Sequence, residues 1–295
     1  EDFPTSKSAD IGSVGLIGRE NATILNTALF KVIRKVTDGF SKALREEKIT
    51  SAKQYLCQNN GTLMALDYAE KYPILTIGSG PTNSIRGAAY LSGKKNALVL
   101  DIGGTTSDIG ALVNGFPRES SKSVIVGGVE TNFRMPDILS IGLGGGSIVH
   151  KASDGTVTVG PDSVGYAITE KAKIFGGDVV TATDIVVKLG LTKLGDPNLV
   201  EDISENDAQQ ALAAIKKIIE DGIDLMKTSS ENVNLILVGG GSIISPKELI
   251  GVSEVYTNEY GGVANAIGAT IAQIGGEFEK IYPYVDVPRQ EALAD

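Results

Sequence analysis

One turn in the sequence has residue types that could bind a phosphate group. An apolar run at 97–100 leads into Asp101-Ile-Gly-Gly-Thr-Thr-Ser-Asp108. Adjacent glycines let consecutive backbone N–H groups converge on an anion, and the hydroxyls of Thr105 and Thr106 can also donate. Asp101 could hold Mg²⁺ through water, because this ion keeps much of its hydration shell. The combination predicts a phosphate loop. The alternative is a tight hairpin whose glycines supply positive φ, with Asp101 as a turn residue.

Two further glycine clusters also follow expected elements. Gly239-Gly-Gly-Ser242 comes after the apolar run 235–238, and Gly142-Leu-Gly-Gly-Gly-Ser147 follows a helix-like stretch. Clustered glycine brings backbone close to a ligand or to a packed element. The residues leave both interpretations open.

Hydrophobic spacing predicts the elements that must position these turns. Apolar residues at helical spacing predict a long amphipathic helix over 23–45. The other expected helices lie at 62–69, 85–91, 161–174, 181–189, 207–226 and 262–273. The expected strands lie at 55–57, 74–77, 97–100, 109–113, 123–126 and 235–238. Strands mixed with helices and meeting at glycine-rich turns predict an α/β fold with layered helices.

Composition excludes several classes of protein. The net charge is −9 without a Lys/Arg cluster, which argues against nucleic acid as a partner. Apolar runs all fall short of the roughly 18 residues of a membrane span. The single cysteine, Cys57, is interpreted as a buried structural thiol and is typical of a reducing compartment, so a cytoplasmic protein is expected. One histidine, His150, excludes a His/Cys zinc site and is interpreted as a surface or strand-end residue.

Four motifs, in order, resemble the ATPase core shared by actin, hexokinase-like sugar kinases and the seventy-kilodalton chaperones. They are the segments 80–90, 99–108, 237–242 and 262–270. In that superfamily they correspond to a hinge helix, the second phosphate loop, an adenosine loop and a second hinge helix. Small residues on the hinge helices suit a close crossing between lobes that rotate. The resemblance implies a ribonuclease-H-like lobe of the actin/hexokinase type, with a mixed sheet and flanking helices. It also implies two domains: 1–93, the remainder of a first lobe with its hinge helix, and 94–295, the second lobe.

The finer detail resembles the hydantoinase/oxoprolinase family, A subunit. The matching segments cover nearly the whole chain: 19–26, 58–61, 79–81, 140–147, 159–165, 175–177 and 181–184. The resemblance implies ATP and Mg²⁺ as cofactors, a small cyclic amide of the hydantoin or 5-oxoproline type as substrate, and a B subunit as a possible partner. Asp101 and Asp108 are then the candidate catalytic residues, with Asp101 as the metal ligand. The candidate nucleotide-binding residues are Gly103, Gly104, Thr105, Thr106, Gly239, Gly240, Gly241 and Ser242.

The chain departs from the family pattern in two places. The segment 166–174 lacks the Pro- and Tyr-containing turn that the family often has. A first Asp-x-Gly-Gly-Thr loop is absent upstream of Asp101, which, with the missing initiator Met, predicts a C-terminal portion of a longer protein that binds nucleotide weakly by itself. The alternatives are a non-catalytic nucleotide-binding or interaction module and a small-molecule kinase. Asp108 and Asp184 are candidates for positioning metal or water, or else are cap or turn residues.

Overall fold

The computed structural model describes residues 3–11, 15–120, 123–275 and 282–294. Its main sheet has the strand order β12-β11-β3-β4-β5, and β8 also pairs with β4. These strands are β3 (Ala97–Ile102), β4 (Ser107–Val113), β5 (Phe116–Pro117), β8 (Ile138–Ile141), β11 (Val233–Val238) and β12 (Val252–Tyr256). β11 is parallel to β3 and to β12, whereas β4 is antiparallel to both β3 and β8. The sheet is therefore mixed.

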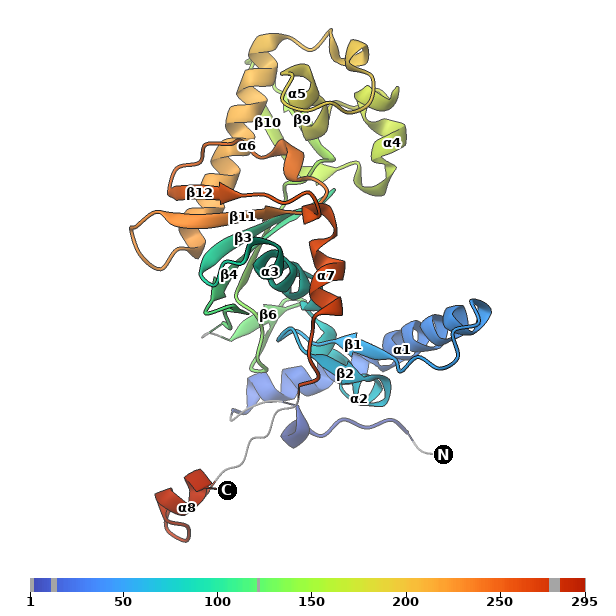
Figure 1. Cartoon of the computed structure of the whole chain (residues 1–295), viewed down its shortest axis with the longest axis vertical. Coiled ribbons are helices and arrows are strands. Elements are labelled where there is room, and N and C mark those ends of the chain that lie inside the picture. Colours follow the sequence, from blue (N-terminus) through green and yellow to red (C-terminus); the bar gives the residue numbers. More distant parts are fainter. Residues whose placement is uncertain (1–2, 12–14, 121–122, 276–281, 295) are drawn as a thin grey trace.

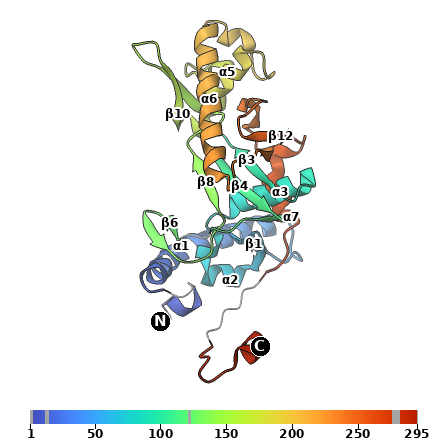
Figure 2. The same ribbon diagram turned by 90° about the vertical axis from the view of Figure 1, so that its left-hand side faces the viewer.

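Helices cover both faces of this sheet (Figures 1 and 2). Side chains alternate along β3, so that Leu100 packs toward α6 (Glu205–Met226) while Val99 packs toward α3 (Ser79–Ser92) and α7 (Ala264–Thr270). Burial of both faces explains why β3 is apolar without interruption until it reaches its last residues. The predicted α/β class, with a mixed sheet and flanking helices, is confirmed.

α3 and α7 cross closely because each has a glycine at the crossing. A Cβ at Gly87 would lie 1.9 Å from the carbonyl oxygen of Ala264, and one at Gly268 would lie 1.9 Å from that of Asn83. Larger side chains would force the helices apart. The close crossing expected for these small-residue helices is confirmed.

Smaller elements extend the fold at both ends of the sheet (Figure 1). Above it lie β9 (Ser147–Lys151), β10 (Val157–Ser163), η3 (Gly165–Ala167), α4 (Ile168–Lys171), η4 (Lys173–Phe175), α5 (Ala182–Lys188) and η5 (Pro197–Val200). Below it lie η1 (Ser8–Asp10), α1 (Ile17–Glu46), β1 (Tyr55–Cys57), β2 (Leu63–Ala65), α2 (Leu66–Lys71), η2 (Pro73–Thr76), β6 (Val124–Val126) and β7 (Val129–Thr131). The short helices η6 (Ser242–Ile244) and η7 (Gly261–Val263) follow β11 and β12, and α8 (Arg289–Ala294) ends the described chain.

The end of the chain after α7 returns to the N-terminal residues. The backbone N–H of Leu63 donates to the carbonyl of Gln273 at 2.8 Å, and Ile274 forms a parallel bridge with Leu63. Residues 273–275 thus extend the β1–β2 hairpin on the side of β2. The division into 1–93 and 94–295 stays a prediction.

Four expected elements are wrong. The helix-like stretch before Gly142 is the strand β8, which pairs with β4. The apolar run 74–77 forms the 3₁₀ helix η2, which begins at Pro73, instead of a strand. The expected helix 161–174 contains the end of β10 followed by short helical turns. In β10 the buried Val157 and Val159 flank the exposed Thr158, as the alternation of a strand requires. The expected helix 62–69 is split into β2 and α2.

Candidate functional site

The turn between β3 and β4 exposes backbone donors. The Gly103 N–H donates to the carbonyl of Thr106 at 2.9 Å, which closes the hairpin. Gly104, Thr105 and Thr106 are exposed, and their N–H groups make no hydrogen bond to any of the described residues. A Cβ at Gly104 would meet nothing within 4 Å. The turn is therefore both a hairpin and an open row of three backbone donors, while Gly103 is already used.

The turn after β11 lies directly beside the first turn. β3 and β11 are parallel neighbours with Asp101 opposite Val238, so both turns leave the same edge of the sheet. The Gly241 N–H donates to the carbonyl of Ile102 at 2.8 Å. At Gly239, where φ is +89°, a Cβ would lie 2.3 Å from Oδ1 of Asp101. Glycine is required there because the backbone touches the carboxylate.

Gly240 and Ser242 complete this second turn. Gly240 is exposed, and a Cβ added to it would meet nothing within 4 Å, as at Gly104. Ser242 begins η6, and its N–H donates to the carbonyl of Gly239 at 3.2 Å. The fold thus brings together the two glycine loops that were predicted from separate parts of the sequence.

Two carboxylates stand on adjacent strands at the base of the open turn. Asp101 on β3 is the register partner of Asp108 on β4, so both side chains project from the same face of the sheet. The Ser140 hydroxyl, on β8, donates to Oδ1 of Asp108. Burial raises the pKa of Asp108, and the negative charge of Asp101 raises it further, while the Ser140 hydrogen bond acts in the opposite direction. Asp108 is thus a carboxyl group that holds its proton more tightly than usual.

The donor set of this corner fits Mg²⁺. No group of three or more His, Cys, Asp or Glu side chains suitable for a metal occurs in the described part of the chain. Mg²⁺, however, is usually bound by one or two carboxylates together with phosphate oxygens and water. Asp101, half-buried next to the exposed turn, supplies such a carboxylate.

The third glycine cluster, 142–146, has a different role. Its N–H groups are used by the protein: Gly145 donates to the carbonyl of Gly103 at 3.0 Å, and Gly146 donates to that of Gly104 at 2.7 Å. A Cβ at Gly144 would lie 2.6 Å from the backbone nitrogen of Thr105. This loop supports the open turn from behind. Of the two interpretations that the sequence left open, the structural one holds here.

Asp184 is a cap residue. Its side chain is fully buried, and both oxygens accept hydrogen bonds from protein donors. Oδ1 accepts from the Ile174 N–H at 2.7 Å, and Oδ2 accepts from the Thr181 N–H at 2.6 Å and from the Thr181 hydroxyl at 2.7 Å. Thr181 and Asp184 form a capping box at the start of α5. With its oxygens occupied in this way, Asp184 is not available to position a metal ion or water.

Three supporting residues were not found from the sequence. The Ser107 hydroxyl donates to the carbonyl of Leu143 at 2.6 Å, and that of Thr183 donates to the carbonyl of Gly145 at 2.7 Å. Ser140 holds Asp108. The only available signal was position: Ser107 is within the Asp101–Asp108 motif, and the others lie in segments already quoted for the family resemblance. Their bonding partners depend on contacts between distant segments.

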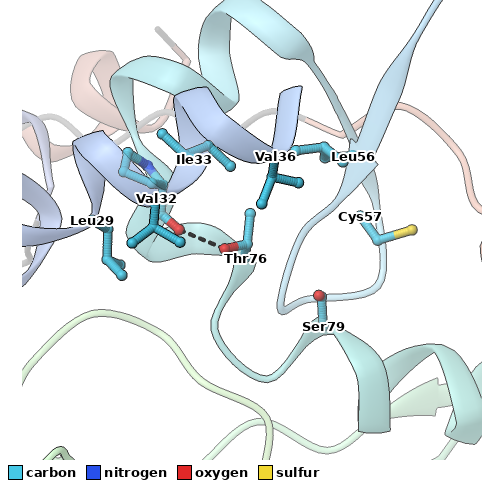
Figure 3. A pocket seen from close by; sticks show the side chains of 9 residues that line it. Leu29, Val32, Ile33, Val36, Leu56, Cys57, Thr76 and Ser79 are labelled. Carbon is cyan, nitrogen blue, oxygen red and sulfur yellow. Dashed lines mark hydrogen bonds between the residues drawn. The ribbon is translucent and has the colours of Figure 1, made fainter. Parts of the chain in front are cut away.

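An apolar groove lies elsewhere on the molecule (Figure 3). It has a volume of about 210 Å³ between α1, β1 and η2, and its lining includes Leu29, Val32 and Val36 from α1. None of the lining residues belongs to the glycine loops. Cys57 lines the groove and is half-buried, so the prediction of a buried thiol is wrong. An aliphatic groove does not suit a triphosphate.

Two further observations concern the single histidine and membrane-spanning helices. His150 lies near the end of β9, is exposed, and pairs with Asp162 at 2.8 Å, as expected for a surface residue. No helix within the described ranges combines the length and the apolarity that crossing a bilayer requires.

The fold and the paired turns together define an α/β lobe with an open, glycine-rich edge at the carboxyl ends of two parallel strands. A sequence profile of the hydantoinase/oxoprolinase family matches residues 19–196, which is more than half of the chain. The chain belongs to the hydantoinase/oxoprolinase family, and the resemblance drawn from the motifs is confirmed.

Two relatives of known activity are similar to this chain in sequence. It is 28% identical over 214 residues to the acetone carboxylase beta subunit of Xanthobacter autotrophicus, which covers 70% of this chain and 29% of that protein. It is 27% identical over 230 residues to the caprolactamase subunit alpha of Pseudomonas jessenii, with 75% and 32% covered. The chain therefore spans about a third of the length of these relatives.

A solved structure supports the fold. The crystal structure of the ATP-dependent caprolactamase from Pseudomonas jessenii superimposes with a TM-score of 0.72 at 21% identity. The match covers 91% of this chain and 43% of that one.

Proposed function

We propose that this chain is the nucleotide-binding part of an ATP-dependent hydrolase of small cyclic amides, of the hydantoin or 5-oxoproline type. The observation that carries the proposal is the exposed turn Gly104–Thr106, whose three N–H groups have no partner among the described residues. Unpaired backbone donors at the carboxyl edge of a parallel strand pair suit phosphate oxygens. Family membership and the ATP-dependent caprolactamase relative support the same assignment.

The proposed chemistry activates the amide through its oxygen. The carbonyl oxygen of the amide attacks the γ-phosphorus of ATP, and ADP leaves. Water then adds to the ring carbon, the C–N bond breaks, and a second water releases the phosphate. One ring amide, one ATP and two waters thus give the ring-opened amino acid, ADP and phosphate. The barrier falls because the phosphorylated oxygen makes the ring carbon a better electrophile than an amide carbon.

The residues of the open edge take separate roles in this proposal. The N–H groups of Gly104–Thr106 hold the transferring phosphate and its developing negative charge. Gly239–Ser242 borders the adenosine side. Asp101 would hold Mg²⁺, which neutralises phosphate charge when bound. Asp108, whose pKa is raised by burial and which accepts a hydrogen bond from Ser140, would take up a proton from water more readily than an ordinary carboxylate.

Calorimetric titration of this chain with Mg-ADP and Mg-ATP tests nucleotide binding. We expect a Kd weaker than micromolar, because the contacts of a first phosphate loop are missing from the chain. Asp101→Asn should weaken Mg-dependent binding by about ten- to a hundredfold, the equivalent of one charge-assisted contact. The control Asp154→Asn alters an exposed turn carboxylate and should leave the Kd unchanged. Absence of binding at millimolar nucleotide by folded protein would refute the proposal. Sub-micromolar binding would refute the expectation that this chain binds nucleotide weakly without a first phosphate loop.

Substrate identity is tested with the full-length protein and its partner subunit, because the chain spans about a third of its relatives. ADP release stimulated by hydantoin, 5-oxoproline or caprolactam supports the hydrolase. The acetone carboxylase relative favours a second candidate, an ATP-dependent carboxylase subunit, for which acetone with bicarbonate would stimulate instead. Stimulation by a sugar or acetate indicates a kinase, and binding without any stimulated turnover indicates a non-catalytic module.

A further inference from the structure

The open turn owes its position to a stack of three backbone layers. The turn itself is the first layer, and its carbonyls at Gly103 and Gly104 accept from the N–H groups of Gly145 and Gly146 at 3.0 and 2.7 Å. Those glycines form the second layer, packed so closely that a Cβ at Gly144 would overlap the turn. The first layer therefore cannot move without breaking bonds to the second.

The start of α5 is the third layer. Thr183 donates twice to the Gly145 carbonyl, from its N–H at 3.0 Å and from its hydroxyl at 2.7 Å. The Thr183 side chain is almost fully buried, and Asp184 fixes the same helical turn through its bonds to Thr181 and Ile174. A bridge between Ile148 and Thr181 ties the strand after the glycine loop to the residue before α5.

We propose that Thr183 is a positioning residue for the nucleotide site. Its hydroxyl holds the Gly145 carbonyl, Gly145 in turn holds the Gly103 carbonyl, and the donors of Gly104–Thr106 are thereby fixed for the phosphate groups. The inference rests on the proposed function for the identity of the ligand. It assigns a task to the Thr-Ala-Thr-Asp segment 181–184, which the proposed chemistry does not use.

The test compares Thr183→Val, which removes the hydroxyl and keeps the shape, with Thr183→Ser, which keeps the hydroxyl. The matched control is Thr131→Val, because Thr131 is also buried and its hydroxyl donates to a backbone carbonyl, that of Val124, in the distant β6–β7 hairpin. Hydrogen exchange of the Gly103, Gly145 and Gly146 amides is measured in protein without nucleotide. Loss of one hydrogen bond should speed their exchange about five- to tenfold in Thr183→Val only.

Mg-ADP titration gives the second readout. We expect the Kd to rise about five- to tenfold in Thr183→Val, with Thr183→Ser close to wild type and Thr131→Val unchanged. Unchanged exchange at the three amides in folded Thr183→Val overturns the inference, as does equal weakening of nucleotide binding by Thr131→Val. If the wild type binds no nucleotide, the proposed function fails, and the exchange rates still decide whether Thr183 fixes the turn.

Discussion

The turns at 103–106 and 142–146 are alike in sequence and opposite in structure. Both are rich in glycine and are followed by a strand that begins with serine. In the first, three N–H groups point at no acceptor among the described residues. In the second, the N–H groups of Gly144, Gly145 and Gly146 all bond to protein oxygens. Glycine leaves backbone donors open in one turn and allows close packing in the other.

The carboxylates near the two turns repeat this difference. Asp184, behind the packed turn, uses both oxygens to accept protein N–H and O–H groups. Asp108, beneath the open turn, has Ser140 as its hydrogen-bonding partner and an unfavourable neighbour in Asp101. A carboxylate whose bonds are satisfied within the protein contributes to stability, whereas one held in an unfavourable setting is a candidate for chemistry. Substitutions should therefore distinguish the residues that stabilise the fold from the candidates for chemistry.

The largest effect is expected for Asp184→Ala. The change leaves the buried N–H groups of Ile174 and Thr181 without acceptors, so the free energy of unfolding should fall by about 3–4 kcal/mol. Thermal unfolding should then occur about 5–6 °C lower. The control is Asp196→Ala, which removes an exposed cap and should cost about 1 kcal/mol. Equal losses for the two variants would contradict the structural role of Asp184.

Gly144→Ala comes next. Its methyl group would lie 2.6 Å from the carbonyl carbon of Gly104 and from the nitrogen of Thr105, and backbone atoms cannot give way as a flexible side chain can. Overpacking of this kind should cost about 2–3 kcal/mol, measured by urea unfolding. Because the methyl group also displaces the open turn, nucleotide binding should weaken in the same variant. A variant as stable as wild type would show that the packed turn is looser than described.

Sequence reasoning succeeded where the signal was local. The apolar runs around Leu100 and Leu237 predicted the central strands, and the order of motifs indicated the family. It failed at 74–77, because a four-residue apolar run fits a buried strand and a buried helical turn equally well. It could not distinguish the glycines of the two turns, since their surroundings are built by α5 and by Gly241, both distant along the chain. The bonds of Thr183 and Ser140 are beyond local patterns for the same reason.

Gly104→Ala tests the open side of the comparison. No atom lies within 4 Å of the added methyl group, and the residue does not have positive φ, so the free energy of unfolding should change by less than about 0.5 kcal/mol. The methyl group would occupy space proposed for phosphate oxygens, so the Kd for Mg-ADP should rise about tenfold. Loss of stability comparable with that of Gly144→Ala would remove the distinction between the turns. Unchanged affinity would place the nucleotide elsewhere.

The smallest effect concerns the pH dependence of stability at Asp108. Burial raises the pKa of this carboxyl in the folded protein, so the folded state binds the proton more tightly than the unfolded state. The free energy of unfolding should therefore decrease as pH rises from the unfolded pKa, about 4, through the raised folded pKa, and stay lower above it. Asp108→Asn removes this contribution, so its stability relative to wild type should increase over that interval. Denaturant unfolding between pH 3 and 8 measures the difference, on the order of 1 kcal/mol or less. A difference that is constant with pH would show that Asp108 titrates normally, and the open turn would lose the proton-holding carboxylate that distinguishes it from the packed one.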